Sequence, residues 1–374
     1  MNKLFKTIIE LRNSSDFCID TSNSNRYRIV INENNGTKTA YYFSAPIYNI
    51  NSKKLLDLKF TNGTTPRLIG SNAQITFSNS INLNNQNGNC YISLNDRIDR
   101  ISDYELHEGE NVIMPTLNGF VYKIPIKNAS QRLIRLKTNR NFLTTRANNK
   151  CFALMIDKFT PFICVSAIGI EDGSGHIKSP FIISNRKLSD REYEISSSGS
   201  INLGKYLVFE INMYERKLIQ DTTVESLNSK TNNAFGTMAY IGVSTEFGEQ
   251  WLYSRIDYMR MGEIAGCRVK NATAYIPKLN NSTVDADAYK VSERFCSFGS
   301  TWDNKKSASS HINRSYDMDN YIAVDITGAL IHERSKQIIA TNGLIFKPSN
   351  KNGFVAISTG DSCFLPQIIA INYY

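Results

Sequence analysis

The C-terminal part of the chain contains the segment Trp251-Leu252-Tyr253-Ser254-Arg255-Ile256-Asp257, and similar short segments run from Gln220 to the last residue. Further members are Ala274-Tyr275-Ile276, Val324-Asp325-Ile326-Thr327, Asn342-Gly343-Leu344-Ile345-Phe346 and Phe354-Val355-Ala356-Ile357-Ser358. A period of two also dominates the earlier part of the chain, for example in Tyr27-Arg28-Ile29-Val30-Ile31. This period is typical of strands rather than helices. The sequence therefore predicts an all-β chain with very little helix.

Residues that favour tight turns separate the expected strands. Asn-Gly dipeptides, which accept positive φ angles, occur at Asn34-Asn35-Gly36, Asn118-Gly119 and Asn352-Gly353. Many short strands with such turns are typical of sandwiches or barrels closed by antiparallel connections. The best helical candidates are residues 2–11 and the turn or two after Thr327, whose hydroxyl is expected to cap residues 328–333. We therefore expect tandem antiparallel β-sandwich domains.

The order and spacing of the segments after Gln220 resemble the DNRLRE type of β-sandwich module. Besides the segments above, the resemblance rests on Asp221-Thr222-Thr223-Val224, Phe235-Gly236-Thr237, Tyr240-Ile241-Gly242-Val243, Ser300-Thr301-Trp302-Asp303-Asn304 and Pro366-Gln367-Ile368-Ile369-Ala370-Ile371. Phe298 stands where this type of module has a Trp. The resemblance covers residues 220–374. It implies a jelly-roll-like sandwich without a catalytic group, of the kind found in bacterial surface proteins and beside phage structural genes.

The module positions predict a structural core. Its expected members are Trp251, Ile256, Tyr275, Trp302, Val324, Ile326, Leu344, Phe354 and Ile369. A sugar-binding platform needs exposed Trp or Tyr side chains, whereas both tryptophans occupy positions that fit better as core plugs.

A chain of 374 residues is long enough for two or three domains. We expect an N-terminal arm over residues 1–20, a β-domain over 21–215 and the DNRLRE-like sandwich over 220–374. The β-domain is either a diverged copy of the C-terminal module or an unrelated domain. A copy would align Ala73-Gln74-Ile75 with Ala274-Tyr275-Ile276, and Val121-Tyr122-Lys123-Ile124 with Ile322-Ala323-Val324-Asp325.

The formal net charge of +9 could steer the chain toward polyanions. The densest basic stretch comprises Arg132, Arg135, Lys137, Arg140, Arg146 and Lys150. It is interleaved with Leu133, Ile134 and Leu136 at strand spacing, which indicates a solvated strand face rather than a nucleic-acid groove. A specific nucleic acid is therefore not an expected partner, whereas an anionic glycan on a host surface is retained as one.

Seven cysteines are spread along the chain without a Cys-x-x-Cys pair. This pattern predicts reduced core residues and folding in a reducing cytoplasm. Lys6, Glu10 and Arg12 interrupt the first apolar residues, so we expect no secretory signal. No segment approaches the roughly 20 apolar residues of a membrane span, so membrane insertion is not expected either.

We expect no catalytic, cofactor-binding or metal-binding residues. His107, His176, His311 and His332 lack zinc-site spacing, and His332 is expected at the surface. Asp257 and Asp325 are the carboxylates to weigh for glycoside hydrolysis, but their strand context favours structural carboxylates that are either solvated or bonded to turn amides. The compact acidic groups Asp285-Ala286-Asp287 and Asp317-Met318-Asp319-Asn320 lack the remaining ligands of a helix-loop-helix calcium site, which leaves bound calcium an open question.

These observations predict a non-catalytic structural and interaction protein of a phage or phage-like particle, as a head decoration, fibre, neck or baseplate component. It would be made in the host cytoplasm, reside in the virion, and act by multivalent docking. Its partners would be other virion proteins and copies of itself. One alternative is a bacterial cell-surface or spore-associated polysaccharide-binding module. A second is a glycan-degrading enzyme.

Overall fold

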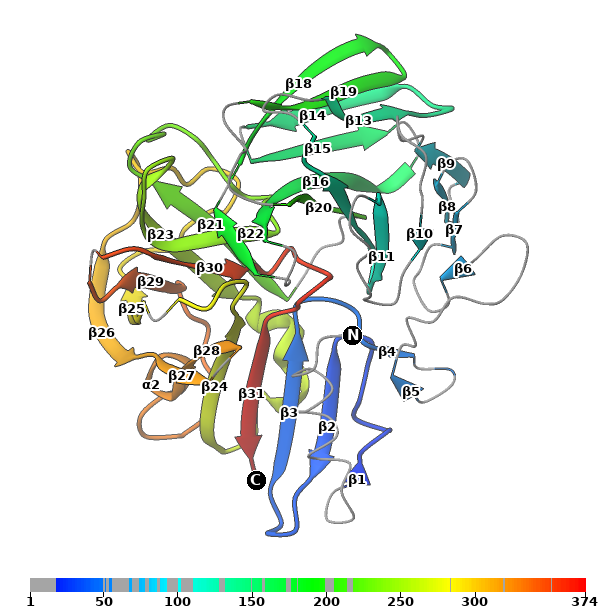
Figure 1. Ribbon diagram of the computed structural model, residues 1–374. Helices are drawn as coiled ribbons and strands as arrows, with labels where there is room; N and C mark the ends of the chain where they lie inside the picture. Colours follow the sequence, from blue (N-terminus) through cyan, green and yellow to red (C-terminus); the bar gives the residue numbers. More distant parts are fainter. Residues whose placement is uncertain are drawn as a thin grey trace. The chain divides into compact units, whose positions relative to one another are not determined.

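The described part of the chain consists mostly of strands, with very little helix, as the computed structural model shows (Figure 1). The structure describes residues 18–49, 51, 54–55, 67–68, 74–77, 81–85, 88–92, 100–101, 110–127, 132–148, 150–156, 159–172, 176–179, 181–198, 205–213, 218–282, 284–318, 320–350 and 352–374. Within these residues the helices are the 3₁₀ helix η1 (Tyr258–Ile264) and the single turn α2 (Thr327–Leu330). The prediction of an all-β chain made of antiparallel sheets is confirmed, although residues 100–101 pair in parallel with residues 112–113. The helical candidate at residues 2–11 lies outside the described residues.

The chain divides into two compact units, and the second is inserted into the chain of the first. Unit 1 comprises Met1–Leu55, Lys217–Ala234 and Met238–Tyr374. Unit 2 comprises Leu56–Arg216 together with Phe235–Thr237.

Unit 1 contains two seven-stranded antiparallel sheets. Sheet I has the strand order β1 (Cys18–Ile19), β2 (Arg28–Asn32), β3 (Lys38–Phe43), β31 (Ile368–Tyr373), β24 (Val269–Pro277), β28 (Tyr321–Asp325) and β27 (Tyr316–Met318). Sheet II has the order β26 (Ala308–Arg314), β25 (Ala286–Val291), β29 (Leu344–Pro348), β23 (Gly248–Ile256), β22 (Met238–Ser244) and β30 (Phe354–Ser358). Its seventh strand, β21 (Ile219–Glu225), pairs with the edge of β23 opposite the edge that β22 and β29 share. After β3 the chain forms a small hairpin of β4 (Tyr48–Asn49) and β5 (Lys54–Leu55).

The main core of unit 1 lies between these two sheets. Tyr42 and Ile371 of sheet I and Ile241 and Phe346 of sheet II belong to one cluster of buried apolar side chains. Side chains on one face of a strand are two residues apart, so each strand sends alternate residues into this core. Burial of this apolar surface is the main stabilising contribution to the sandwich.

Strands from the two ends of the described chain meet in sheet I. β31 lies between β3 and β24 and is hydrogen-bonded to both, so Tyr42 pairs with Ile369 across the ladder (Figure 1). The predicted assignment of residues 21–215 to one domain and residues 220–374 to another is therefore wrong for β2 and β3. These two strands belong to the same sheet as β24, β28 and β31 of the C-terminal part. The predicted arm over residues 1–20 also changes at its end, because Cys18–Ile19 forms β1.

Unit 2 contains an eight-stranded and a three-stranded sheet around its own core. The larger sheet has the order β10 (Arg100–Ile101), β11 (Val112–Thr116), β12 (Gly119–Pro125), β20 (Tyr206–Met213), β16 (Phe159–Glu171), β15 (Cys151–Ile156) and β14 (Phe142–Ala147), with β17 (Ile177–Ser179) paired to β16. The smaller has the order β13 (Arg132–Lys137), β19 (Glu192–Ser198) and β18 (Ile182–Ser189). Phe209 of the first and Ile195 of the second are fully buried in the shared core.

The strand pairing of unit 2 differs from that of the C-terminal module. A four-stranded sheet has the order β6 (Arg67–Leu68), β7 (Gln74–Phe77), β8 (Ile81–Asn85) and β9 (Gly88–Ile92). In a diverged copy, β7 would pair with β12 as β24 pairs with β28. Instead β7 pairs with β6 and β8, while β12 pairs with β11 and β20. The proposed alignment of the two halves therefore does not describe the observed sheets.

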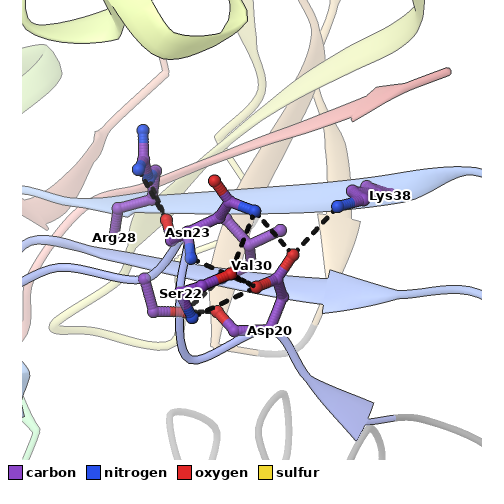
Figure 2. Close-up of polar contacts among 7 residues, drawn as sticks. Asp20, Ser22, Asn23, Arg28, Val30 and Lys38 are labelled. Atoms are coloured by element: carbon purple, nitrogen blue, oxygen red, sulfur yellow. Dashed lines mark hydrogen bonds and ion pairs between the residues drawn. The ribbon is translucent and has the colours of Figure 1, made fainter.

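A carboxylate organises the turn between β1 and β2. Asp20 accepts hydrogen bonds from the backbone N–H groups of Ser22 and Asn23, from both of their side chains, and from Lys38 Nζ at 2.9 Å (Figure 2). Burial alone would raise the pKa of Asp20, but these hydrogen bonds outweigh it and hold the pKa well below the usual range. Arg28 completes the turn by donating to the carbonyl oxygen of Asn23.

The short helix α2 is present, but its predicted cap is not. The hydroxyl of Thr327 accepts the backbone N–H of Ala272 at 2.8 Å instead of capping its own helix. The backbone N–H of Thr327 donates to Asp325 Oδ1 at 2.9 Å. The hydroxyl therefore ties α2 to strand β24, a tertiary contact that sequence spacing does not reveal.

Candidate functional site

A second, smaller core covers the face of sheet II that points away from the main core. In β23, Leu252 faces the main core and the next residue, Tyr253, faces the smaller one. Tyr253 packs there with Val224, Val291, Phe295 and Ile345. The segment 292–307, which we call the clasp loop, contributes Phe295 and lies over this face.

The clasp loop is fixed by polar contacts to the rest of unit 1. Asn232 Nδ2 donates to the carbonyl oxygens of Ser297 at 2.6 Å and Ser300 at 2.8 Å. The hydroxyl of Tyr253 donates to the carbonyl oxygen of Lys306. Asn342 Nδ2 donates to the carbonyl oxygen of Ser292 at the start of the loop. Because both ends and the middle of the loop are bonded, its backbone is held in a defined arrangement.

Both tryptophans of the chain lie side by side at the edge of the smaller core. Trp251 comes from β23 and Trp302 from the clasp loop, and their ring centroids are 4.9 Å apart with an interplanar angle of 51°. Both are half-buried and keep part of their surface exposed to solvent. Half-buried indoles are a departure from the predicted core plugs, because the clasp loop covers the sheet only in part.

Two lysines lie over these rings. Lys305 Nζ is 3.9 Å from the ring centroid of Trp302 and 5.4 Å from that of Trp251. Lys347 Nζ is 4.1 Å from the centroid of Trp251 and 5.1 Å from that of Tyr289. These are cation–π distances. We call the five residues Trp251, Tyr289, Trp302, Lys305 and Lys347 the aromatic–lysine patch.

The electrostatics of the patch are set by its two ammonium groups. Burial lowers the pKa of Lys347, the carboxylate of Glu249 opposes this shift, and Lys305 adds to it. Glu249 also accepts a hydrogen bond from Trp251 Nε1 at 3.0 Å. Two like charges over one indole repel each other, so the patch favours a ligand that brings negative charge.

The edge strand β26 borders the patch with further polar groups. The ring of His311 is edge-on to that of Tyr289, with centroids 5.2 Å apart. Asp287 Oδ1 accepts from Arg314 Nε at 3.2 Å and lies 3.8 Å from His311 Nε2. Asp287 and Lys347 are also partners in the ladder between β25 and β29, so this carboxylate lies next to the patch.

The structure divides the predicted core residues by chemical type. The aliphatic members are buried in the main core: Ile256, Val324, Ile326, Leu344 and Ile369. The aromatic members, Trp251, Tyr275, Trp302 and Phe354, are only half-buried. Trp251 and Trp302 lie at the edge of the smaller core, Tyr275 packs at the edge of another cluster, and Phe354 stacks edge-on against Tyr240.

Asp257 and Asp325 each have a structural partner. Asp257 caps η1 by accepting the backbone N–H of Met259 at 3.2 Å, and Asp325 accepts that of Thr327. This agrees with the expectation of carboxylates bonded to turn amides. His332 is exposed and accepts from the backbone N–H of Ser335 at 3.4 Å. His176 is exposed as well, whereas His107 lies outside the described residues.

Among the described residues, no group of three His, Cys, Asp or Glu side chains is arranged to hold a metal ion. Asp287 is engaged by Arg314. Asp319, a member of the second acidic group, is outside the described residues.

The cysteines and the basic stretch show where strand context predicts burial and where it does not. Cys151, Cys164 and Cys363 are buried as expected, but Cys296 in the clasp loop is exposed. In β13, Ile134 and Leu136 are buried while Arg135 points outward and pairs with Glu192 at 3.2 Å. The solvated strand face is present there. Lys150, at the end of the same basic stretch, is buried instead.

Several buried carboxylates were not expected from the sequence, and they serve the fold. Asp221 is 3% exposed and accepts hydrogen bonds from the backbone N–H of Gly360 and from Gln367 Nε2. In unit 2, Lys123 Nζ lies 2.5 Å from Glu171 Oε2, and both side chains are buried. A buried charge is tolerated only when it is paired or hydrogen-bonded, and each of these is.

The chain matches no family model and no curated protein. Neither helix in the described part of the chain has the length and apolar character that a membrane span requires.

Proposed function

We propose that this chain is a non-catalytic structural and interaction protein, carried in many copies on a phage or phage-like particle. The observation that supports it best is the aromatic–lysine patch. Its half-exposed indoles and ammonium groups are held by a fixed loop on a rigid sheet, as in contact surfaces that rely on aromatic and cationic anchors. The carboxylates weighed for catalysis, Asp257 and Asp325, are bonded to turn amides.

A particle component would gain from such a patch through copy number. A single small patch buries too little surface for tight binding, but many copies held on one particle bind with a high effective concentration. The burial of Cys151, Cys164 and Cys363 fits their role as reduced core residues of a protein that folds in a host cytoplasm before assembly.

The test is to purify particles from a producing culture and label them with antibody to this chain under negative stain. We expect the label at regular positions on a head, neck, tail or baseplate. Chain found only as a free protein in the lysate, with unlabelled particles, would refute the proposal. Label on cell walls or spores would instead support the second candidate, a bacterial surface polysaccharide-binding module, which the same patch favours.

A glycan-degrading activity has a separate test. Purified chain should release no reducing sugar from acidic or neutral polysaccharides, and Asp257→Asn and Asp325→Asn should leave that result unchanged. Release of reducing sugar that either substitution abolishes would refute the non-catalytic assignment.

A further inference from the structure

We propose that the aromatic–lysine patch binds a carboxylate-bearing sugar of an acidic polysaccharide. This inference rests on the proposed function, because it names the ligand of the same patch. Three features of the patch support it: the two indoles, the two ammonium groups and the carboxylates beside them.

The indoles supply apolar surface for a sugar ring beside the ammonium groups that lie over them. The ring centroids of Trp251 and Trp302 are 4.9 Å apart and the ring planes are tilted by 51°, so the two rings are not stacked in parallel. One face of a pyranose carries mostly C–H groups and packs on an aromatic ring, while its hydroxyl groups remain at the periphery. Trp and Tyr combine such a surface with a polar edge.

The lysines supply the charge that a carboxylate needs. The ammonium groups of Lys305 and Lys347 both lie over Trp251, at 5.4 Å and 4.1 Å from its centroid. A carboxylate placed between them would form charge-assisted hydrogen bonds and relieve their repulsion. Lys347 is partly desolvated, which strengthens its interaction with an anion compared with a fully solvated lysine.

The acidic neighbours favour a sugar over a nucleic acid. Glu249 is bonded to Trp251, and Asp287 pairs with the strand position of Lys347. Carboxylate oxygens accept hydrogen bonds from sugar hydroxyls, whereas they repel the closely spaced charges of a row of phosphates. The patch therefore suits carboxylates that are spaced apart by hydroxyl-rich sugar rings.

The chain provides its own reporter for a binding experiment. Its only tryptophans are the two in the patch, so tryptophan emission of the intact protein monitors this site alone. The probes are an oligogalacturonate, the same oligosaccharide as its neutral methyl ester, and inorganic polyphosphate. We expect a saturable emission change with the oligogalacturonate, binding roughly tenfold weaker or less for the ester, and no saturable change with polyphosphate.

Single substitutions identify the contributing side chains. Lys305→Gln and Lys347→Gln should each weaken oligogalacturonate binding by roughly tenfold. Trp302→Leu, which leaves Trp251 as reporter, should weaken it to a similar extent. Lys270→Gln is the matched control, because Lys270 is an exposed lysine of β24 on the other sheet. Circular dichroism and thermal unfolding establish whether each variant is folded. If Trp302→Leu does not fold, the two Lys→Gln variants still test the proposal.

Each outcome decides the assignment. Equal binding of acid and ester, an equal response to polyphosphate, unchanged affinity in both Lys→Gln variants, or no response to any probe would overturn it. If the chain is found on particles but does not bind the oligogalacturonate, the proposed ligand is wrong and the proposed function stands. If the chain binds the oligogalacturonate but the particles are unlabelled, the proposed location on a particle is wrong and the proposed ligand stands.

Discussion

Gly343 holds a backbone geometry on which the clasp loop depends. Its φ angle is +128°, and a Cβ atom there would lie 2.6 Å from the ring of Phe295. Gly343→Ala should therefore strain the backbone and displace Phe295, lowering the free energy of unfolding by about 2–4 kcal/mol. Urea denaturation followed by tryptophan emission measures this. Gly262→Ala is the control, since a Cβ there meets nothing within 4 Å, and an equal loss in both variants would contradict the explanation.

Asp20 predicts a defined dependence of stability on pH. Its pKa is lower in the folded chain than in the unfolded one, so its contribution is complete above the unfolded pKa of about 3.9 and is lost as the pH falls below it. Asp20→Asn should cost about 1–3 kcal/mol at pH 7, and the difference from the wild type should shrink between about pH 4 and pH 2. Thermal unfolding across this range tests it. Asp303→Asn, at an exposed position, is the control and should change the stability at pH 7 by about 0.5 kcal/mol or less.

At the residue level, aliphatic side chains were the most predictable. Ile256 and Val324 lie in strands where alternation alone assigns them to the buried face. The fate of Trp251 and Trp302 was not predictable in the same way, because it depends on how far the clasp loop extends over the sheet. Loop coverage is a tertiary property, and a large amphipathic ring is stable either buried or half-exposed.

Strand β31 contributes more to the stability of unit 1 than its length suggests. It fills the gap between β3 and β24, and Ile368 and Ile371 are fully buried. A chain that ends at Gln367 should therefore lose the cooperative unfolding transition of unit 1 and show red-shifted tryptophan emission. A chain that ends at Tyr373, which lacks only an exposed residue, should differ from the wild type by about 1 kcal/mol or less. Equal stability of both truncations would show that β31 is dispensable.

At the element level, the positions of turns were predicted better than the pairing of strands. Asn34-Asn35-Gly36 was identified from its dipeptide, and Gly36 has a φ angle of +80° at the β2–β3 hairpin. The pairing of β3 with β31 joins residues more than 300 positions apart, and a local pattern contains no information about it. The same limit applies to the hydroxyl of Thr327, which bonds β24 rather than its own helix.

The discontinuous course of unit 1 leads to a test on the whole molecule. Residues 218–374 alone should aggregate, because they expose the edge of β31 that β3 normally covers. Joining Leu55 to Lys217 through a flexible linker of about 15 residues should restore a soluble, cooperatively folding unit with native tryptophan emission. Size-exclusion chromatography and thermal unfolding compare the two proteins. If residues 218–374 fold as well as the linked form, β2 and β3 are not needed.

The sequence indicated the fold class, but not the way the chain is divided. The expected boundary near residues 215–220 lies where the chain leaves unit 2, since unit 1 resumes at Lys217. The other boundary, after Leu55, was missed because β2 and β3 have the same alternating pattern as strands of any β-domain. Periodicity distinguishes strand from helix, but it does not specify which sheet a strand joins.

The placement of β31 also sets an order of events during synthesis. A ribosome releases β2 and β3 more than 300 residues before the strand that completes their sheet. At about 5–20 residues per second, these strands wait tens of seconds with an unpaired edge. Unit 2 emerges from the ribosome entirely within that interval, so it can fold while unit 1 is still incomplete. Slower translation should therefore lengthen the exposure of the early hairpin to chaperones and proteases.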